Sequence, residues 1–378
     1  MRIYGSEVTG SLRVKGDIFA ENYIVKSTVS TITQSFSSGS TIFGDSADDT
    51  HQFTGSLFIS GSRISIDDGG ANTAIGKNAG QAITSGARNI AIGNNSLDAL
   101  TTGTNNVSIG VSALTAADGL ERENVAIGYY AGGAVNSDSA TRNVFIGEYA
   151  GYGGTGALNY SVAIGYQALD ATGANGLTGA IAIGYQAFSG LTTGIQNTAI
   201  GYQSGRTTTT GARNTFLGYE AGEDTTGGSD NTYLGNRAGG DHTGTYNTFV
   251  GSNTGKGVSG GSSNGSSNTA VGYNAVNAIT TGYGNTAVGT ETLDAVTEGF
   301  YNIGIGPAAG GSITTGDYNI AIGYAAFDAA TTAGSTIAIG YAALSAYSHG
   351  ENSFNVAIGT QTAYLKTSGR FKIGRAHV

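Results

Sequence analysis

The stretch NTAIGYQSGRTTTTGARNTFLGYEAG, Asn197–Gly222, contains nearly the same short motif twice. In both copies an asparagine stands four residues before a glycine, and these two motif glycines, Gly201 and Gly218, are seventeen residues apart. The motif glycine recurs seventeen times, at intervals of 16 to 21 residues, at positions 76, 93, 110, 128, 147, 165, 184, 201, 218, 235, 251, 272, 289, 306, 323, 340 and 359. A period of this length predicts a solenoid, in which copies of one unit stack on each other.

The third residue before each motif glycine and the residue directly before it are both aliphatic or β-branched. A β-branched residue such as Thr198 stands three residues before it, and Ile, Leu or Val, such as Ile200, stands directly before it. This alternation, closed by glycine, predicts a short strand whose buried face is formed by these two positions. The residue between them would then point away from the core. Where it is aromatic, we expect contacts with other chains of an assembly: Phe145, Phe216, Tyr233 and Phe249.

The positions around the strand have a fixed chemistry as well. Only Ala, Ser or Thr stands three residues after the motif glycine, which suits a narrow interior. Asn stands four residues before it in fourteen of seventeen copies, and stacked amides can form a ladder of hydrogen bonds. Another glycine stands seven residues before it in eleven copies, often in a Thr-Thr-Gly turn such as Thr192–Gly194.

One such unit cannot bury its apolar side chains alone, so it must stack on its neighbours. We therefore predict an all-β protein, a single-chain β-solenoid (β-roll or β-helix) of about seventeen 17-residue coils over residues 69–370. Residues 1–68 lack the repeat and are expected to form a β-rich shaft or attachment region of short strands. Residues 371–378 are expected to be an irregular tail. One codon choice for Ile373–Val378 matches the start of a common sequencing adapter, so this segment is interpreted as read-through.

Composition excludes several classes of function. Charged residues are 11% of the chain and the net charge is −9, so there is no basic patch for nucleic acid. The chain has no cysteine for disulfides or thiolate metal sites. No apolar run is long enough for membrane insertion, and the first residues lack a secretory apolar stretch, so we expect a soluble protein made without export.

No catalytic, cofactor or metal site is predicted. The four His are widely separated, and the acidic residues Asp45, Asp48 and Asp49 lack the order of a calcium loop. Four aspartates share the position five residues after the motif glycine but belong to coils expected to lie far apart along the rod, too far for their carboxylates to pair across a catalytic groove: Asp98, Asp170, Asp294 and Asp328. The sequence thus favours a non-enzymatic protein.

Tyrosine often follows the motif glycine, and stacked rings at this position could bind sugars or proteins. Six of these residues are candidates for receptor contact: Tyr166, Tyr185, Tyr202, Tyr219, Tyr324 and Tyr341. A packing ladder or a contact between chains would produce the same pattern. Longer coils between 110 and 184, and insertions at 255–268 and 347–354, are further candidates for binding loops.

The segment GDSADDTHQFTGSLFISGS, Gly44–Ser62, followed by the tandem NTAIGYQAG-like units, resembles the shaft of bacteriophage tail-fibre and related structural proteins. The units are also similar to the head repeats of bacterial trimeric autotransporter adhesins. Both resemblances imply a homotrimer that presents a surface to a host-cell glycan or protein, in a virion tail or on a bacterial cell. Phage fibres of this type often end in a chaperone domain, which would be missing here.

The adhesin resemblance is incomplete, because adhesin head repeats are shorter and no signal peptide, heptad stalk or membrane barrel is visible. The phage interpretation is therefore preferred. An ice-binding solenoid is a further alternative, since the chain is rich in threonine. However, the Thr-Thr-Gly threonines stand at turns and not as Thr-x-Thr within strands.

Overall fold

The computed structural model describes residues 70–378 apart from 155, 174–175, 259–262, 348–353, 365–372 and 376–378. The chain separates into two units, Met1–Ile64 and Ser65–Val378. The predicted β-rich region 1–68 lies outside the described residues. Within the described part of the chain, no helix has the length and apolar character needed to cross a membrane.

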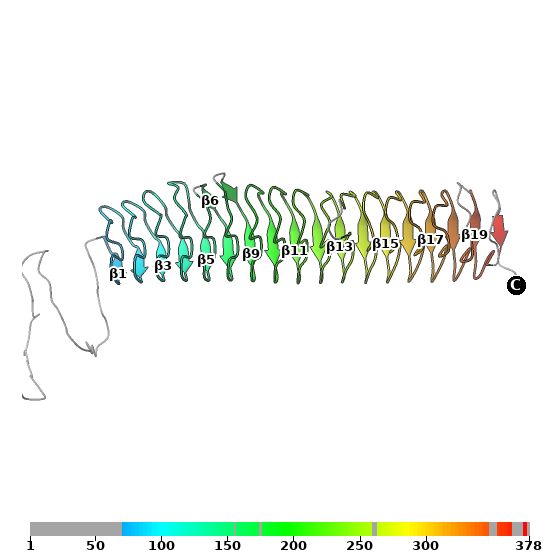
Figure 1. Ribbon diagram of the computed structural model, residues 1–378, viewed down its shortest axis with the longest axis horizontal. Coiled ribbons are helices and arrows are strands. Elements are labelled where there is room, and N and C mark those ends of the chain that lie inside the picture. The colour runs from blue at the N-terminus through cyan, green and yellow to red at the C-terminus, as the bar shows by residue number, and fades with distance from the viewer. Residues whose placement is uncertain are drawn as a thin grey trace, which may run out of the picture. The chain divides into compact units, whose positions relative to one another are not determined.

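The second unit is an all-β solenoid, which confirms the predicted fold class (Figure 1). Successive coils each contribute one three-residue strand to a parallel sheet. Its strands are β1 (Thr73–Ile75), β2 (Ile90–Ile92), β3 (Val107–Ile109), β4 (Val125–Ile127), β5 (Val144–Ile146), β7 (Val162–Ile164), β9 (Ile181–Ile183), β10 (Thr198–Ile200), β11 (Thr215–Leu217), β12 (Thr232–Leu234), β13 (Thr248–Val250), β14 (Thr269–Val271), β15 (Thr286–Val288), β16 (Ile303–Ile305), β17 (Ile320–Ile322), β18 (Ile337–Ile339), β19 (Val356–Ile358) and β20 (Ile373–Arg375).

Two further strands, β6 (Leu158–Asn159) and β8 (Leu177–Thr178), form a small second parallel sheet in the longer coils. The last strand, β20, pairs in parallel with β19. Residues 371–378 were expected to be irregular, and for Ile373–Arg375 this prediction is wrong, because the backbone there continues the ladder.

Equivalent residues of successive coils lie directly opposite each other. Ile75 pairs with Ile92, and Ile92 pairs with Ile109. The same one-to-one register continues through the sheet, so each motif position becomes a column along the axis. One coil advances the column by the spacing of neighbouring strands, about 4.8 Å.

The predicted buried and exposed faces of the strands are wrong and must be exchanged. The middle residue points inward in β2–β5, β7 and β9–β19, and Phe145, Phe216, Tyr233 and Phe249 are completely buried in the core of their own chain. They are therefore not surface residues through which chains of a trimer could meet. The first and third residues of these strands, β2–β5, β7 and β9–β19, point outward and are half-buried or exposed. A period of two separates the faces of a strand but does not identify the inner one.

The interior accepts one large side chain in most coils, at either of two positions. Phe216 is the middle residue of β11, and the residue four after its motif glycine is Gly222, whose added Cβ would press on the Phe216 ring. In the coil of β9 the sizes are reversed, with Ala182 in the strand and Phe188 four after the motif glycine. The position three after the motif glycine is small throughout, which fits the expected narrow interior.

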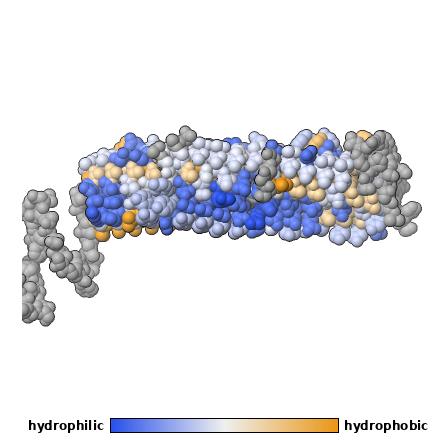
Figure 2. All heavy atoms as spheres, viewed as in Figure 1, coloured by the Kyte–Doolittle hydropathy of each residue, from blue (hydrophilic) through white to orange (hydrophobic). Residues whose placement is uncertain are grey.

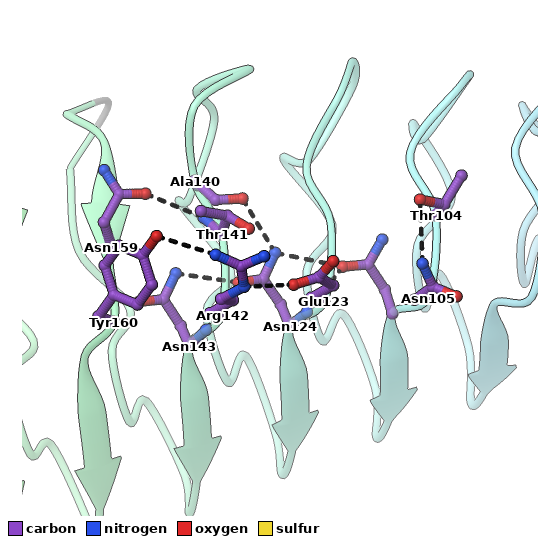
Figure 3. A network of polar contacts seen from close by, with 11 residues as sticks. Thr104, Asn105, Glu123, Asn124, Ala140, Thr141, Arg142, Asn143, Asn159 and Tyr160 are labelled. Carbon is purple, nitrogen blue, oxygen red and sulfur yellow. Dashed lines mark hydrogen bonds and ion pairs between the residues drawn. The ribbon is translucent and has the colours of Figure 1, made fainter.

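The asparagines four residues before the motif glycines form the predicted ladder of hydrogen bonds between successive coils (Figure 3). Asn143 donates from Nδ2 to Oδ1 of Asn124 at 2.9 Å, and Asn124 donates in the same way to Asn106 at 3.2 Å. Each side chain also donates to a backbone carbonyl of the next coil, as Asn124 does to Ala140. These amides are buried, so the ladder satisfies backbone and side-chain groups that water cannot reach.

The motif glycine is required by conformation and by space. Gly201 has φ +141°, a backbone conformation that residues with a Cβ rarely adopt. A Cβ there would also collide with the carbonyl of Gly218 in the next coil. The sharp turn after the strand is thus repeated at the same place in each coil, and the following residues form columns on the surface.

Candidate functional site

Tyrosines form a stacked column on the surface, and each of them directly follows the motif glycine that ends a strand. The rings of Tyr166, Tyr185, Tyr202 and Tyr219 lie 5.4, 5.0 and 5.3 Å apart, with interplanar angles of 12°, 8° and 8°. Each of these side chains is exposed. We call these four residues the tyrosine ladder.

The other two candidates, Tyr324 and Tyr341, form a separate stacked pair at 5.4 Å. The coils between the pair and the ladder carry Asn236, Ser252, Thr290 and Pro307 at this position, and only Tyr273 has an aromatic ring there. The structure therefore divides the six predicted receptor-contact residues into two groups. Their role in binding remains a prediction.

The stacking limits how the tyrosine ladder can bind a ligand. Neighbouring rings cover each other's faces, so the ladder offers ring edges and hydroxyl groups along its length. At the Tyr219 end, the guanidinium carbon of Arg237 lies 6.0 Å from the centre of the ring, so the guanidinium covers the outer face of Tyr219. A hydrogen bond with Glu220 raises the pKa of Tyr219 above its ordinary value. Such a column suits polar contacts more than stacking on a ring face.

A column of amides runs beside the tyrosine ladder. Gln186 donates to Gln167 at 2.9 Å, and Gln203 donates to Gln186 at 3.0 Å. The column continues into an ion pair between Arg237 and Glu220 at 2.6 Å. Hydroxyls, amides and carboxylates thus lie in register, a mixture of donors and acceptors that hydroxyl-rich ligands such as glycans can use.

Two hollows follow the amide column on its far side. The first is lined by residues including Asp170, Gln186, Arg206 and Thr207. The second is charged and is lined by Glu220, Glu223, Asp224, Arg237, Gly240, Asp241 and Lys256. Burial raises the pKa of Asp170 to about 6. Figure 2 shows hydrophilic residues along much of the length of the side in view.

One expectation about carboxylates is wrong. Asp294 and Asp328 were placed in coils too far apart to approach each other, yet they lie two coils apart and flank the same residue. A Cβ added to Gly311, in the coil between them, would lie 3.1 Å from Asp294 Oδ1 and 2.9 Å from Asp328 Oδ1. The missing side chain of Gly311 lets both carboxylates lean over the intermediate coil, which repeat spacing alone does not predict.

Two aromatic groups were not predicted from the sequence. Tyr129, Tyr130, Tyr149 and Tyr152 contact one another near the beginning of the array. A second group lies before the strands of its coils and contains Tyr283, Phe300, Tyr301 and Tyr318. The signal of the second group was present at the positions five and six before the motif glycine, where aromatic residues recur in neighbouring coils.

Part of the predicted binding loops falls outside the described residues, namely 259–262 and 348–353. Comparisons of the chain with protein-family models, curated proteins and solved structures found no match.

Proposed function

We propose that this chain is a non-enzymatic structural and adhesive protein, the shaft of a bacteriophage tail fibre that works as a homotrimer and contributes to host-cell recognition in the virion. The observation that carries this proposal is the outward face of the sheet. Two parallel columns of aliphatic and β-branched residues run along it, and many of these side chains are exposed, among them Ile75, Leu217, Leu234, Val271, Val288, Ile305 and Ile358. We call this surface the outer sheet face.

An apolar surface of this extent is unusual for a protein that remains monomeric. It consists of the first and third residues of the strands, which the parallel pairing of the sheet holds in register. Copies of the same chain present the same straight columns with the same spacing. Further copies are therefore the occupants that match this face best, and their association would bury it along the axis.

The receptor surface is proposed on another side of the coils. The tyrosine ladder, the adjoining amide column and the hollow lined by Asp170 and Arg206 form a polar strip that follows the strands. Its hydroxyl, amide and carboxylate groups suit a host-cell glycan or a polar protein surface. The tyrosine pair Tyr324 and Tyr341, with Gln361 and Tyr364 beside it, would provide a second contact.

The same geometry is compatible with the head of a bacterial trimeric adhesin on a cell surface, which also requires self-association. Ice binding is a different alternative with one observation in its favour. The first residues of β10 to β15 form an uninterrupted threonine column on the outer sheet face. Thermal hysteresis from a protein that remains monomeric would support ice binding over self-association.

The proposal is tested by the oligomeric state of the full chain in light scattering after size-exclusion chromatography. We expect three times the 37.8 kDa chain mass. The double variant Leu217→Lys/Leu234→Lys should be monomeric, because lysines on the outer sheet face repel each other and must be desolvated in an interface. The control Thr226→Lys/Asn236→Lys adds the same charge at exposed positions off this face and should remain trimeric. A monomeric parent chain would contradict the proposal.

A further inference from the structure

Three carboxylates meet where two of the longer coils lie side by side. Asp118 and Glu121 lie in the connection between β3 and β4, and Asp138 lies in the connection between β4 and β5. One carboxylate oxygen from each residue lies within 4.8 Å of the other two. The steps between motif glycines are 18 and 19 residues here, so both coils are longer than the regular 17-residue coils.

Glu121 is the unusual member of this group. Its side chain is completely buried, whereas Asp118 and Asp138 are exposed. One of its carboxylate oxygens, Oε2, accepts a hydrogen bond from the Gly119 N–H at 2.9 Å. The other, Oε1, is buried and has no hydrogen-bond partner within the described part of the chain. A buried carboxylate oxygen in this state destabilises the fold unless a cation or a donor reaches it.

The backbone around the group positions the second aspartate. Oδ1 of Asp138 accepts a hydrogen bond from the Leu120 N–H at 3.0 Å, across the two coils. Gly119 makes this approach possible, because a Cβ at that residue would collide with the same oxygen. The third carboxylate is therefore brought over the connection that carries the first two.

Among the residues that the structure describes, no basic side chain forms an ion pair with this group. The ion pairs among the described residues join Arg142 to Glu123, Arg206 to Glu223 and Asp224, Arg213 to Asp230, and Arg237 to Glu220. Figure 3 shows the first of these pairs, which links neighbouring coils near the carboxylate group. Burial raises the pKa of Glu121, and repulsion from Asp118 and Asp138 acts in the same direction. The acidic hollow at Glu223 and Asp224 differs, because arginines compensate its charge.

We propose that Asp118, Glu121 and Asp138 bind one calcium ion that links the two coils. Calcium takes oxygen ligands at 2.3–2.6 Å, so two oxygens on one ion lie at most about 5 Å apart, as these do. The exposed side of the group leaves room for water ligands, which complete an irregular coordination shell more readily for calcium than for magnesium. The ion would offset the charge of Glu121 and fasten coils whose lengths depart from the regular period.

The test uses the full chain, stripped with EDTA and titrated with calcium chloride in a calorimeter. We expect one site per chain and a rise of at least about 3 °C in unfolding temperature when calcium is in large excess over Kd. Asp138→Asn and Asp118→Asn change exposed residues and should each weaken calcium binding at least tenfold. Asp224→Asn, in the arginine-compensated hollow, is the matched control and should bind calcium like the parent chain.

Thermal unfolding in EDTA separates a binding role from a structural one. There Asp138→Asn should unfold at the same or a higher temperature than the parent chain, because it removes repulsion, whereas with calcium the order should reverse. Absence of calcium binding, equal binding by Asp138→Asn, or tighter binding of magnesium chloride than of calcium chloride would each overturn the proposal.

Discussion

In most coils, one of two interior positions holds a large residue and the other a small one: the middle of the strand and the position four after the motif glycine. Phe216 occurs with Gly222, and Ala163 occurs with Leu169. Both arrangements fill a similar interior, and the second position has positive φ whether it holds glycine or leucine: +60° at Gly222 and +55° at Leu169. The two residues therefore share one volume in the core.

This shared volume predicts a rescue. Phe216→Ala should lower the free energy of unfolding by about 3–5 kcal/mol, because it leaves a cavity in a dry core. Adding Gly222→Leu should recover at least half of that loss, since it recreates the arrangement of the β7 coil. Urea denaturation of both single variants and the double variant measures the coupling. Additive effects would contradict the shared volume.

His242 predicts how stability depends on pH. Burial lowers its pKa to about 4, below the value of about 6.5 in an unfolded chain. A depressed folded-state pKa favours the neutral ring, so its contribution is complete above pH 6.5 and is lost as the pH falls toward 4. We expect the free energy of unfolding to be about 2 kcal/mol lower at pH 5 than at pH 7 from this group.

The comparison variant is His242→Leu, because Leu191 is buried at the equivalent position of another coil. It should flatten the pH dependence in urea titrations. Carboxyls with a raised pKa, such as Asp170, act in the opposite direction, because protonation favours their folded state as the pH falls. An identical pH profile in the parent and the variant would exclude His242 as the cause.

At the scale of the strand and its turns, the sequence predicted the elements well and their orientation poorly. The period of two around Thr198 and Ile200 located a strand, and the asparagine column located a ladder that the structure contains. The same period could not decide which face is buried, because both faces carry apolar residues. The small residue three after the motif glycine was the better guide, since a narrow interior leaves room for alanine in the strand but not for two aliphatic columns.

Of the two candidate surfaces, one could be predicted from the sequence and the other could not. The tyrosine ladder could be predicted because its members share one position and the register is constant. The carboxylate group of Asp118, Glu121 and Asp138 could not, because its residues come from coils of irregular length and fall at different positions. Irregular coils carry information in their departures from the repeat, which only the three-dimensional arrangement reveals.

At the scale of the whole array, stability depends on contacts between neighbouring coils, as in other repeat proteins. Deleting one period, Thr286–Asn302, should leave the register of all remaining coils intact. We expect a folded β-protein in circular dichroism whose unfolding temperature changes by less than about 5 °C.

The matched deletion of nine residues, Thr290–Glu298, removes about half a coil. It shifts the strands and columns of the following coils out of register with those before them. It should abolish cooperative unfolding, because the columns of small residues and amides no longer meet their equivalents. Equal tolerance of both deletions would contradict a structure held together by register.

The constant register also has a genetic consequence. Seventeen codons encode one coil, so recombination between misaligned copies of the repeat adds or removes whole coils without a frameshift. The length of the array can then drift in steps of one strand spacing, while every surface column keeps its chemistry. Selection can adjust the reach of such a protein separately from what it contacts.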